Sequence, residues 1–123
     1  MKEKKYETNL KGTKHFFSAF KWSMQGFMST FKGESAFRQE LLLIGFLIPL
    51  AFYLGKNKLE ILLLLIPLFI ILIVELLNTS IESAVDRFGD EYHELSGRAK
   101  DIGSSAVFLS IAMAIFVWLF ILI

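Results

Sequence analysis

The apolar residues of this chain are gathered into three blocks separated by polar segments. The blocks run over 41–54, 61–77 and 106–123, and only Glu75 and Ser110 interrupt them. A helix that crosses a bilayer needs about 20 residues, so the blocks must extend into their flanks. The pattern therefore predicts membrane spans over 36–55, 59–80 and 102–123, with a helix extension and loop over 81–101.

In the segment before the first block, apolar residues alternate with polar ones at a helical period and do not form a continuous run. Large apolar side chains recur every three or four residues, at Phe17, Phe20, Met24, Phe27 and Phe31. The opposite face carries polar and basic residues, namely Lys11, Lys14, Ser18, Lys21 and Gln25. This pattern predicts an amphipathic helix over 8–32 that lies in the membrane interface, with Trp22 directed toward lipid. The alternative is a helix that packs on a partner subunit.

The composition favours a membrane protein. Hydrophobic residues make up 54% and aromatic residues 15% of the 123 positions, more than a soluble domain of this length could bury. Three buried helices in a soluble fold would leave little polar surface, which disfavours that alternative. The chain has no cysteine, so disulfides and thiolate metal sites are excluded. We expect an all-α membrane protein with one integral-membrane domain over residues 1–123.

The distribution of positive charge predicts the orientation. Of the 13 Lys and Arg residues, eight lie before Leu41 and three lie between the second and third spans. Only Lys56 and Lys58 lie between the first and second spans. In a three-span protein the N-terminus and the connection between the second and third spans lie on the same side of the membrane. That side therefore carries eleven Lys and Arg residues, and the opposite side carries two. The positive-inside rule places the N-terminus in the cytoplasm.

Glu75 is the most informative residue because it lies inside an apolar block. A carboxylate at that depth is costly unless it has a partner or a function. At about 100° per residue, one helix face gathers several polar residues. They are Glu75, Asn78, Thr79, Glu82 and Asp86, opposite Leu77, Ile81, Ala84, Val85 and Phe88. The second span is therefore predicted to leave the membrane as one continuous helix with an acidic stripe.

An acidic stripe at a membrane surface can hold Mg²⁺, which takes one or two carboxylates together with phosphate oxygens and water. A further carboxylate can accept the proton of an alcohol, and Glu75 is placed to meet a substrate hydroxyl at the headgroup level. Two alternatives remain open. Glu82 and Asp86 could be solvated carboxylates at a helix end, and Glu75 could belong to the proton or ion relay of a transporter.

Polar segments at the ends of the spans supply further candidates. Glu34 precedes the first span and could cap its helix, and residues 37–40 could bind a headgroup or form salt bridges. The loop 89–94 is polar and turn-like, and Arg98 and Lys100 could neutralise phosphates or anchor the chain at the membrane. Neither GxxxxGKS/T nor GxGxxG occurs, so the usual kinase folds are excluded.

Three motifs carry a resemblance to a known family. They are ESAFRQE at 34–40, VELLNTSIE at 74–82 and VDRFGDEYHELSGRAKD at 85–101. In order and spacing they closely resemble the prokaryotic diacylglycerol kinase family over nearly the whole chain. The resemblance implies a homotrimer of three-span subunits in the bacterial inner membrane, each with an N-terminal surface helix. It also implies transfer of the ATP γ-phosphate to diacylglycerol at the cytoplasmic face, with Mg²⁺, to form phosphatidic acid, and no role for nucleic acid.

The resemblance also implies a role for individual residues. Glu75 would be the general base, Asn78 would support it, and Glu34 and Glu82 would hold the metal. The nucleotide would be contacted by His15, Trp22, Glu34, Glu82, Glu91, Tyr92, His93, Lys100 and Asp101. The lipid side would be formed by Phe37, Arg38, Gln39, Glu40, Glu75 and Ser104.

Two positions depart from the family pattern. The best-known members carry an arginine where this chain has His15, and a tyrosine where it has Trp22. Histidine can still donate to a phosphate, although with less charge at pH 7. An undecaprenol kinase with the same site is the alternative function, but the match over residues 92–98 favours diacylglycerol. A small proton-coupled transporter or a non-catalytic membrane scaffold is a third hypothesis, which ATP binding would separate from the two kinases.

Overall fold

A computed structural model describes residues 11–123, and within them the chain forms four helices and no strand. The helices are α1 (Thr13–Gly33), α2 (Ser35–Leu54), α3 (Lys58–Asp86) and α4 (Glu94–Leu122). The predicted all-α class is confirmed. Residues 8–10 of the predicted amphipathic helix lie outside the described residues, and the helix itself begins at Thr13.

Helices α2, α3 and α4 are each long and apolar enough to cross a membrane. The prediction of three spans is therefore confirmed. At a rise of about 1.5 Å per residue, a helix of 29 residues measures roughly 43 Å. Both α3 and α4 have 29 residues and exceed the roughly 30 Å of a bilayer core. Part of the α3–α4 hairpin must therefore project beyond the hydrocarbon region.

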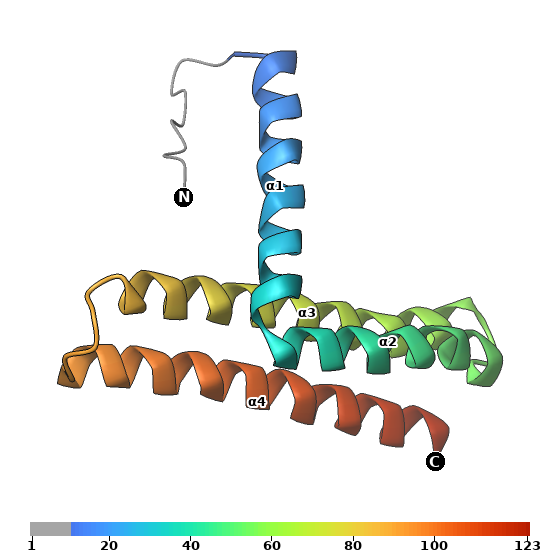
Figure 1. The fold of residues 1–123 in the computed structure, drawn as a ribbon. Helices are drawn as coiled ribbons and strands as arrows, with labels where there is room; N and C mark the ends of the chain where they lie inside the picture. Colours follow the sequence, from blue (N-terminus) through green and yellow to red (C-terminus); the bar gives the residue numbers. More distant parts are fainter. Residues whose placement is uncertain (1–10) are drawn as a thin grey trace.

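Helix α1 runs crosswise to the other three helices (Figure 1). The chain turns at Glu34, whose backbone is extended at φ −120° and ψ 111°. The Arg38 guanidinium donates hydrogen bonds to the carbonyl oxygens of Phe31 at 2.7 Å and Lys32 at 3.1 Å. These carbonyls belong to the last turn of α1, where no backbone donor follows within the helix. Arg38 therefore ties the end of α1 to the start of α2.

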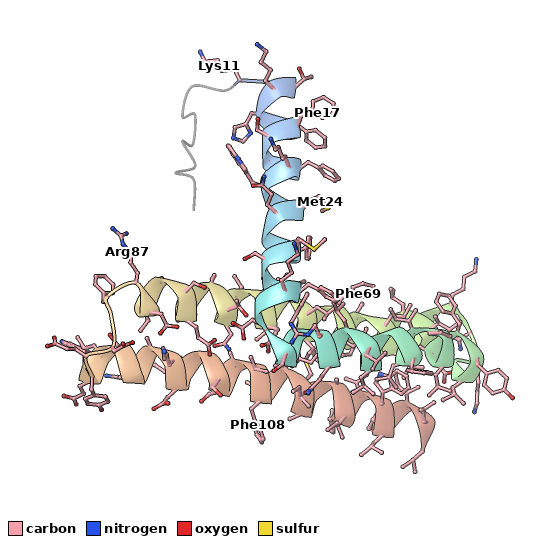
Figure 2. All side chains as sticks on the ribbon, viewed as in Figure 1. Lys11, Phe17, Met24, Phe69, Arg87 and Phe108 are labelled. Atoms are coloured by element: carbon pink, nitrogen blue, oxygen red, sulfur yellow. The ribbon has the colours of Figure 1, made fainter. Side chains whose placement is uncertain are left out.

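The apolar side of α1 points in the direction in which α2 leaves the turn. Figure 2 shows Phe17 and Met24 on this side of the helix. A helix that lies flat on a membrane needs its apolar face directed toward the bilayer interior. The orientation of α1 relative to α2 satisfies that requirement, because α2 runs into the membrane from the same level (Figure 1).

The core of the bundle is small and lies between α2, α3 and α4. Its buried members are Ile44, Leu68, Ile71 and Ala114. Trp118 adds a polar contact, because its indole Nε1 donates to the carbonyl oxygen of Leu64 at 2.9 Å. Leu64 lies three residues before Pro67, which has no N–H and disturbs the hydrogen bonding of the preceding turn. Trp118 therefore joins α4 to α3 next to the proline.

The other end of the hairpin is a short turn after α3. Gly89 adopts φ +95°, a left-handed conformation that glycine tolerates best, and it lets the chain leave the helix. The Nδ1 atom of His93 accepts a hydrogen bond from the backbone N–H of Leu95 at 3.1 Å and caps α4. Within the segment 81–101, predicted as a helix extension and loop, residues 94–101 belong to α4. The predicted continuity of α3 through its acidic stripe to Asp86 is confirmed.

Candidate active site

The acidic stripe of α3 contains two polar residues that the fold buries. Glu75 is 4% exposed and Asn78 is 8% exposed, although both lie in a helix dominated by apolar residues. Farther along the same face, Thr79 and Glu82 are half-buried and Asp86 is exposed. The stripe thus passes from the interior of the bundle to solvent within three turns.

Asn78 and Glu82 are joined by a hydrogen bond. The amide Nδ2 of Asn78 donates to Oε1 of Glu82 at 3.4 Å, one helical turn farther along α3. Residues three and four apart on a helix face are neighbours, so Asn78 lies between Glu75 and Glu82. The three side chains form one continuous polar row at the point where α3 leaves the apolar part of the bundle.

Glu40 of α2 is brought beside Glu75. The two carboxyl groups lie close enough to act on each other. The Oε2 atom of Glu40 is buried from solvent. The charges of Glu34 and Glu82 also act on Glu75. Four acidic residues from two helices and the α1–α2 turn therefore converge on one place.

The side chain of Glu34 forms no capping hydrogen bond, although it occupies the N-cap position of α2. The only ion pair within residues 11–123 joins Lys100 to Asp86, so neither Glu34 nor Glu82 forms one there, although Glu82 lies near enough for its charge to act on Lys100. Uncompensated carboxylates that are partly buried favour a bound cation.

The residues between 11 and 123 contain no group of three or more acidic or histidine side chains arranged to hold a metal on their own. Mg²⁺ is usually bound by one or two carboxylates, with phosphates and water completing its shell. Glu34 and Glu82 match this requirement in number and chemical type, since they are two carboxylates whose charges both act on Glu75.

A cavity of about 650 Å³ lies between the end of α3 and the start of α4. Its volume is in the range of small-molecule sites. Four of the predicted nucleotide residues, Glu91, Tyr92, His93 and Lys100, line it together with Asp86. Asp101 follows directly in α4 but is exposed outside the lining.

Two of these residues are held by contacts that the sequence did not reveal. The Nζ atom of Lys100 lies 2.5 Å from Oδ1 of Asp86. Nδ1 of His93 is an acceptor, so the proton of the neutral ring lies on Nε2 and remains able to donate. The cavity therefore presents an ammonium group and an imidazole donor, and both suit phosphate oxygens.

His15 and Trp22 are not brought to this cavity within the chain. Both lie on α1, which extends away from the α3–α4 hairpin (Figure 1). Nineteen residues separate His15 from the turn at Glu34, which is roughly 28 Å along a helix. The structure thus separates the α1 candidates from the other predicted nucleotide residues.

The predicted lipid-side residues have different environments. Phe37 is buried at 3% exposure, and Arg38 is engaged at the α1–α2 turn. Gln39 and Ser104 are exposed on two different helices. Glu40 lies at a cavity of about 340 Å³ that is otherwise lined by apolar residues of α2, α3 and α4. This apolar lining escaped sequence analysis, because the sequence does not say which sides of the spans face one another.

These features define a polytopic membrane protein with a cluster of acidic side chains near one end of its spans and a polar cavity beside it. The family model for prokaryotic diacylglycerol kinases matches residues 21–122. The chain therefore belongs to the prokaryotic diacylglycerol kinase family.

Individual relatives agree with the family match. A protein of Haemophilus influenzae named diacylglycerol kinase is 48% identical over 107 residues, which cover 87% of this chain and 91% of that protein. The diacylglycerol kinase of Escherichia coli K12 is 40% identical and is matched over 93% of both chains. The diacylglycerol kinase of Helicobacter pylori J99 is 42% identical over 96% of this chain and 92% of its own.

Proposed function

We propose that this protein transfers the γ-phosphate of ATP to the free hydroxyl of diacylglycerol and forms phosphatidic acid. The observation that carries the proposal is the burial of Glu75 beside Asn78, in one row with Glu82, on a helix that emerges from the apolar bundle. A carboxylate in that position can meet an alcohol that diffuses in the membrane. The named relatives, all diacylglycerol kinases, support the same reaction.

In the proposed mechanism Glu75 accepts the proton of the lipid hydroxyl. The alcohol oxygen then attacks the γ-phosphorus, and the bond to the bridging oxygen of ADP breaks. Asn78 keeps Glu75 and Glu82 in register along α3. Mg²⁺ held by Glu34 and Glu82 would neutralise phosphate charge. The remaining task of the protein is to place the alcohol in line with the phosphate.

The nucleotide would lie in the polar cavity between α3 and α4. Lys100 and the Nε2–H of His93 would donate to phosphate oxygens, and Tyr92, exposed at 87%, would offer its ring to the base. Glu91 would accept a hydrogen bond from the ribose or the base. Asp101, exposed just outside the lining, would contact the nucleotide at the edge of the cavity. Phe37, Arg38, Gln39 and Ser104 would bound the lipid side, and Arg38 would do so by fixing the α1–α2 turn.

We further propose that α1 lies in the cytoplasmic interface of the bacterial inner membrane, and that the N-terminus is cytoplasmic. The crosswise orientation of α1 relative to α2 and the direction of the apolar face support this placement. A homotrimer would allow His15 and Trp22 of one subunit to reach the nucleotide of another, since α1 extends away from its own cavity.

Phosphate transfer from labelled ATP in mixed micelles tests the proposal. Diacylglycerol and undecaprenol are offered in parallel, with Mg²⁺. We expect faster labelling of diacylglycerol. Faster labelling of undecaprenol would assign the same site to a polyprenol substrate, which the names of the relatives do not favour. A folded protein that labels neither lipid would contradict the kinase proposal.

A further inference from the structure

Asn78 of α3 faces Gly103 of α4 at a very close approach. Gly103 is buried, and a Cβ atom built on it would overlap Oδ1 of Asn78. The same Cβ would lie 3.4 Å from Cγ of Asn78 and 3.9 Å from Cδ1 of Ile81. The overlap is therefore with the end of the Asn78 side chain alone, and the other two contacts are tolerable.

The hydrogen bond to Glu82 determines which atom of the Asn78 amide faces Gly103. Its Nδ2 donates to Glu82, and an ionised carboxylate can only accept, so Nδ2 must point toward Glu82. Oδ1 then points toward α4, where it is buried and has no hydrogen-bond partner within the described residues. Only a residue without a side chain leaves space for this oxygen at position 103.

We infer that Gly103 is a positioning residue for phosphoryl transfer. Its missing side chain allows α4 to lie against the Asn78 amide and hold it between Glu75 and Glu82. A methyl group at position 103 would push the amide away and break its hydrogen bond to Glu82. The inference rests on the proposed function, because it concerns the alignment of the proposed base and metal ligand.

The first test compares Gly103→Ala with Gly45→Ala. Gly45 is also a glycine within a membrane span, but nothing lies within 4 Å of a Cβ built there. Displacement of a reacting group by about 1 Å can cost on the order of 100-fold in rate. We expect Gly103→Ala to lower kcat by roughly 10- to 100-fold, with KM for ATP and lipid nearly unchanged. Gly45→Ala should keep wild-type kinetics.

A double-mutant cycle with Asn78→Ala shows whether the effect passes through the amide. Shortening Asn78 removes the atom that a methyl at position 103 would overlap. We expect Gly103→Ala to cost less than about 2-fold in kcat in the Asn78→Ala background, since residues in contact are not additive. An equal cost in both backgrounds would overturn the inference. If Gly103→Ala alone does not fold, the double variant should fold, and its failure beside a folded Asn78→Ala variant would also overturn it.

Failure of this inference and failure of the proposed function give different results. An inactive wild-type protein would contradict the kinase proposal before any variant is compared. An active wild-type protein whose Gly103→Ala variant retains its kcat would contradict only the role of Gly103.

Discussion

Lys100 of α4 and Asp86 of α3 form an ion pair, 2.5 Å between Nζ and Oδ1, beside the polar cavity between the two helices. Both side chains are substantially exposed, at 41% and 64%. Exposed ion pairs contribute little to stability. We infer that Asp86 chiefly aims Lys100 at the cavity.

This relationship predicts a difference between two variants. Lys100→Met removes a phosphate-binding charge and should raise KM for ATP by roughly 10-fold or more, because charge-assisted hydrogen bonds are the strong ones. Asp86→Asn keeps the ammonium group and should have a clearly smaller effect. Steady-state kinetics with varied ATP would measure both. Equal effects would mean that the pair acts as a unit rather than through Lys100.

Glu75→Gln should lose transfer while the protein still assembles and binds ATP. General-base catalysis contributes about 10²- to 10⁴-fold, so a loss of at least 100-fold is expected. Glu60→Gln is the matched control, because Glu60 lies in the first turn of α3, at the opposite end of the same helix. A fully active Glu75→Gln variant would remove the assignment of Glu75 as the base.

Glu82→Gln should raise the Mg²⁺ concentration needed for half-maximal activity by roughly 10-fold or more, because it replaces one of two proposed carboxylate ligands by a neutral amide. Titration of activity with Mg²⁺ measures the change. Glu94→Gln is the control, because Glu94 lies in the exposed first turn of α4. This variant should need the same Mg²⁺ concentration for half-maximal activity as the wild type. A chelator should abolish transfer in the wild type, and activity that survives chelation would argue against a metal.

Arg38→Met should loosen the α1–α2 turn. The carbonyls of Phe31 and Lys32 would lose their guanidinium donor, so amide hydrogen exchange in the last turn of α1 should become faster. Arg38→Lys keeps one cationic donor, so its exchange rate in the last turn of α1 should lie between those of the wild type and Arg38→Met. If Arg38 instead binds the lipid headgroup directly, KM for the lipid would rise while exchange in α1 stayed unchanged.

Trp118→Phe should destabilise the bundle without changing the chemistry. Phenylalanine keeps an aromatic ring but cannot donate to the Leu64 carbonyl. The loss of one such hydrogen bond is worth about 1 kcal/mol. Unfolding by denaturing detergent should shift accordingly, with kcat retained. Loss of kcat at full stability would place Trp118 in the reaction rather than in the fold.

The helices and their faces could be predicted from the sequence. Block length determines which segments can cross a bilayer, and the helical period determines which residues share a face. Glu75, Asn78 and Glu82 were therefore placed together correctly, and the amphipathic character of α1 was recognised. Hydropathy alone does not show that α4 begins at Glu94, eight residues before the predicted span over 102–123, because residues 94–101 are mostly polar.

Contacts between helices were decided only by the tertiary structure. The approach of Glu40 to Glu75, the contact of Gly103 with Asn78 and the hydrogen bond from Trp118 to Leu64 each join residues of different helices. Such contacts depend on the rotation and the axial shift of one helix against another. A periodic pattern in a single helix contains neither quantity, because many rotations of an apolar span leave its hydrophobicity unchanged. The sequence thus determined the helices and their polar faces, and packing decided which of those faces meet.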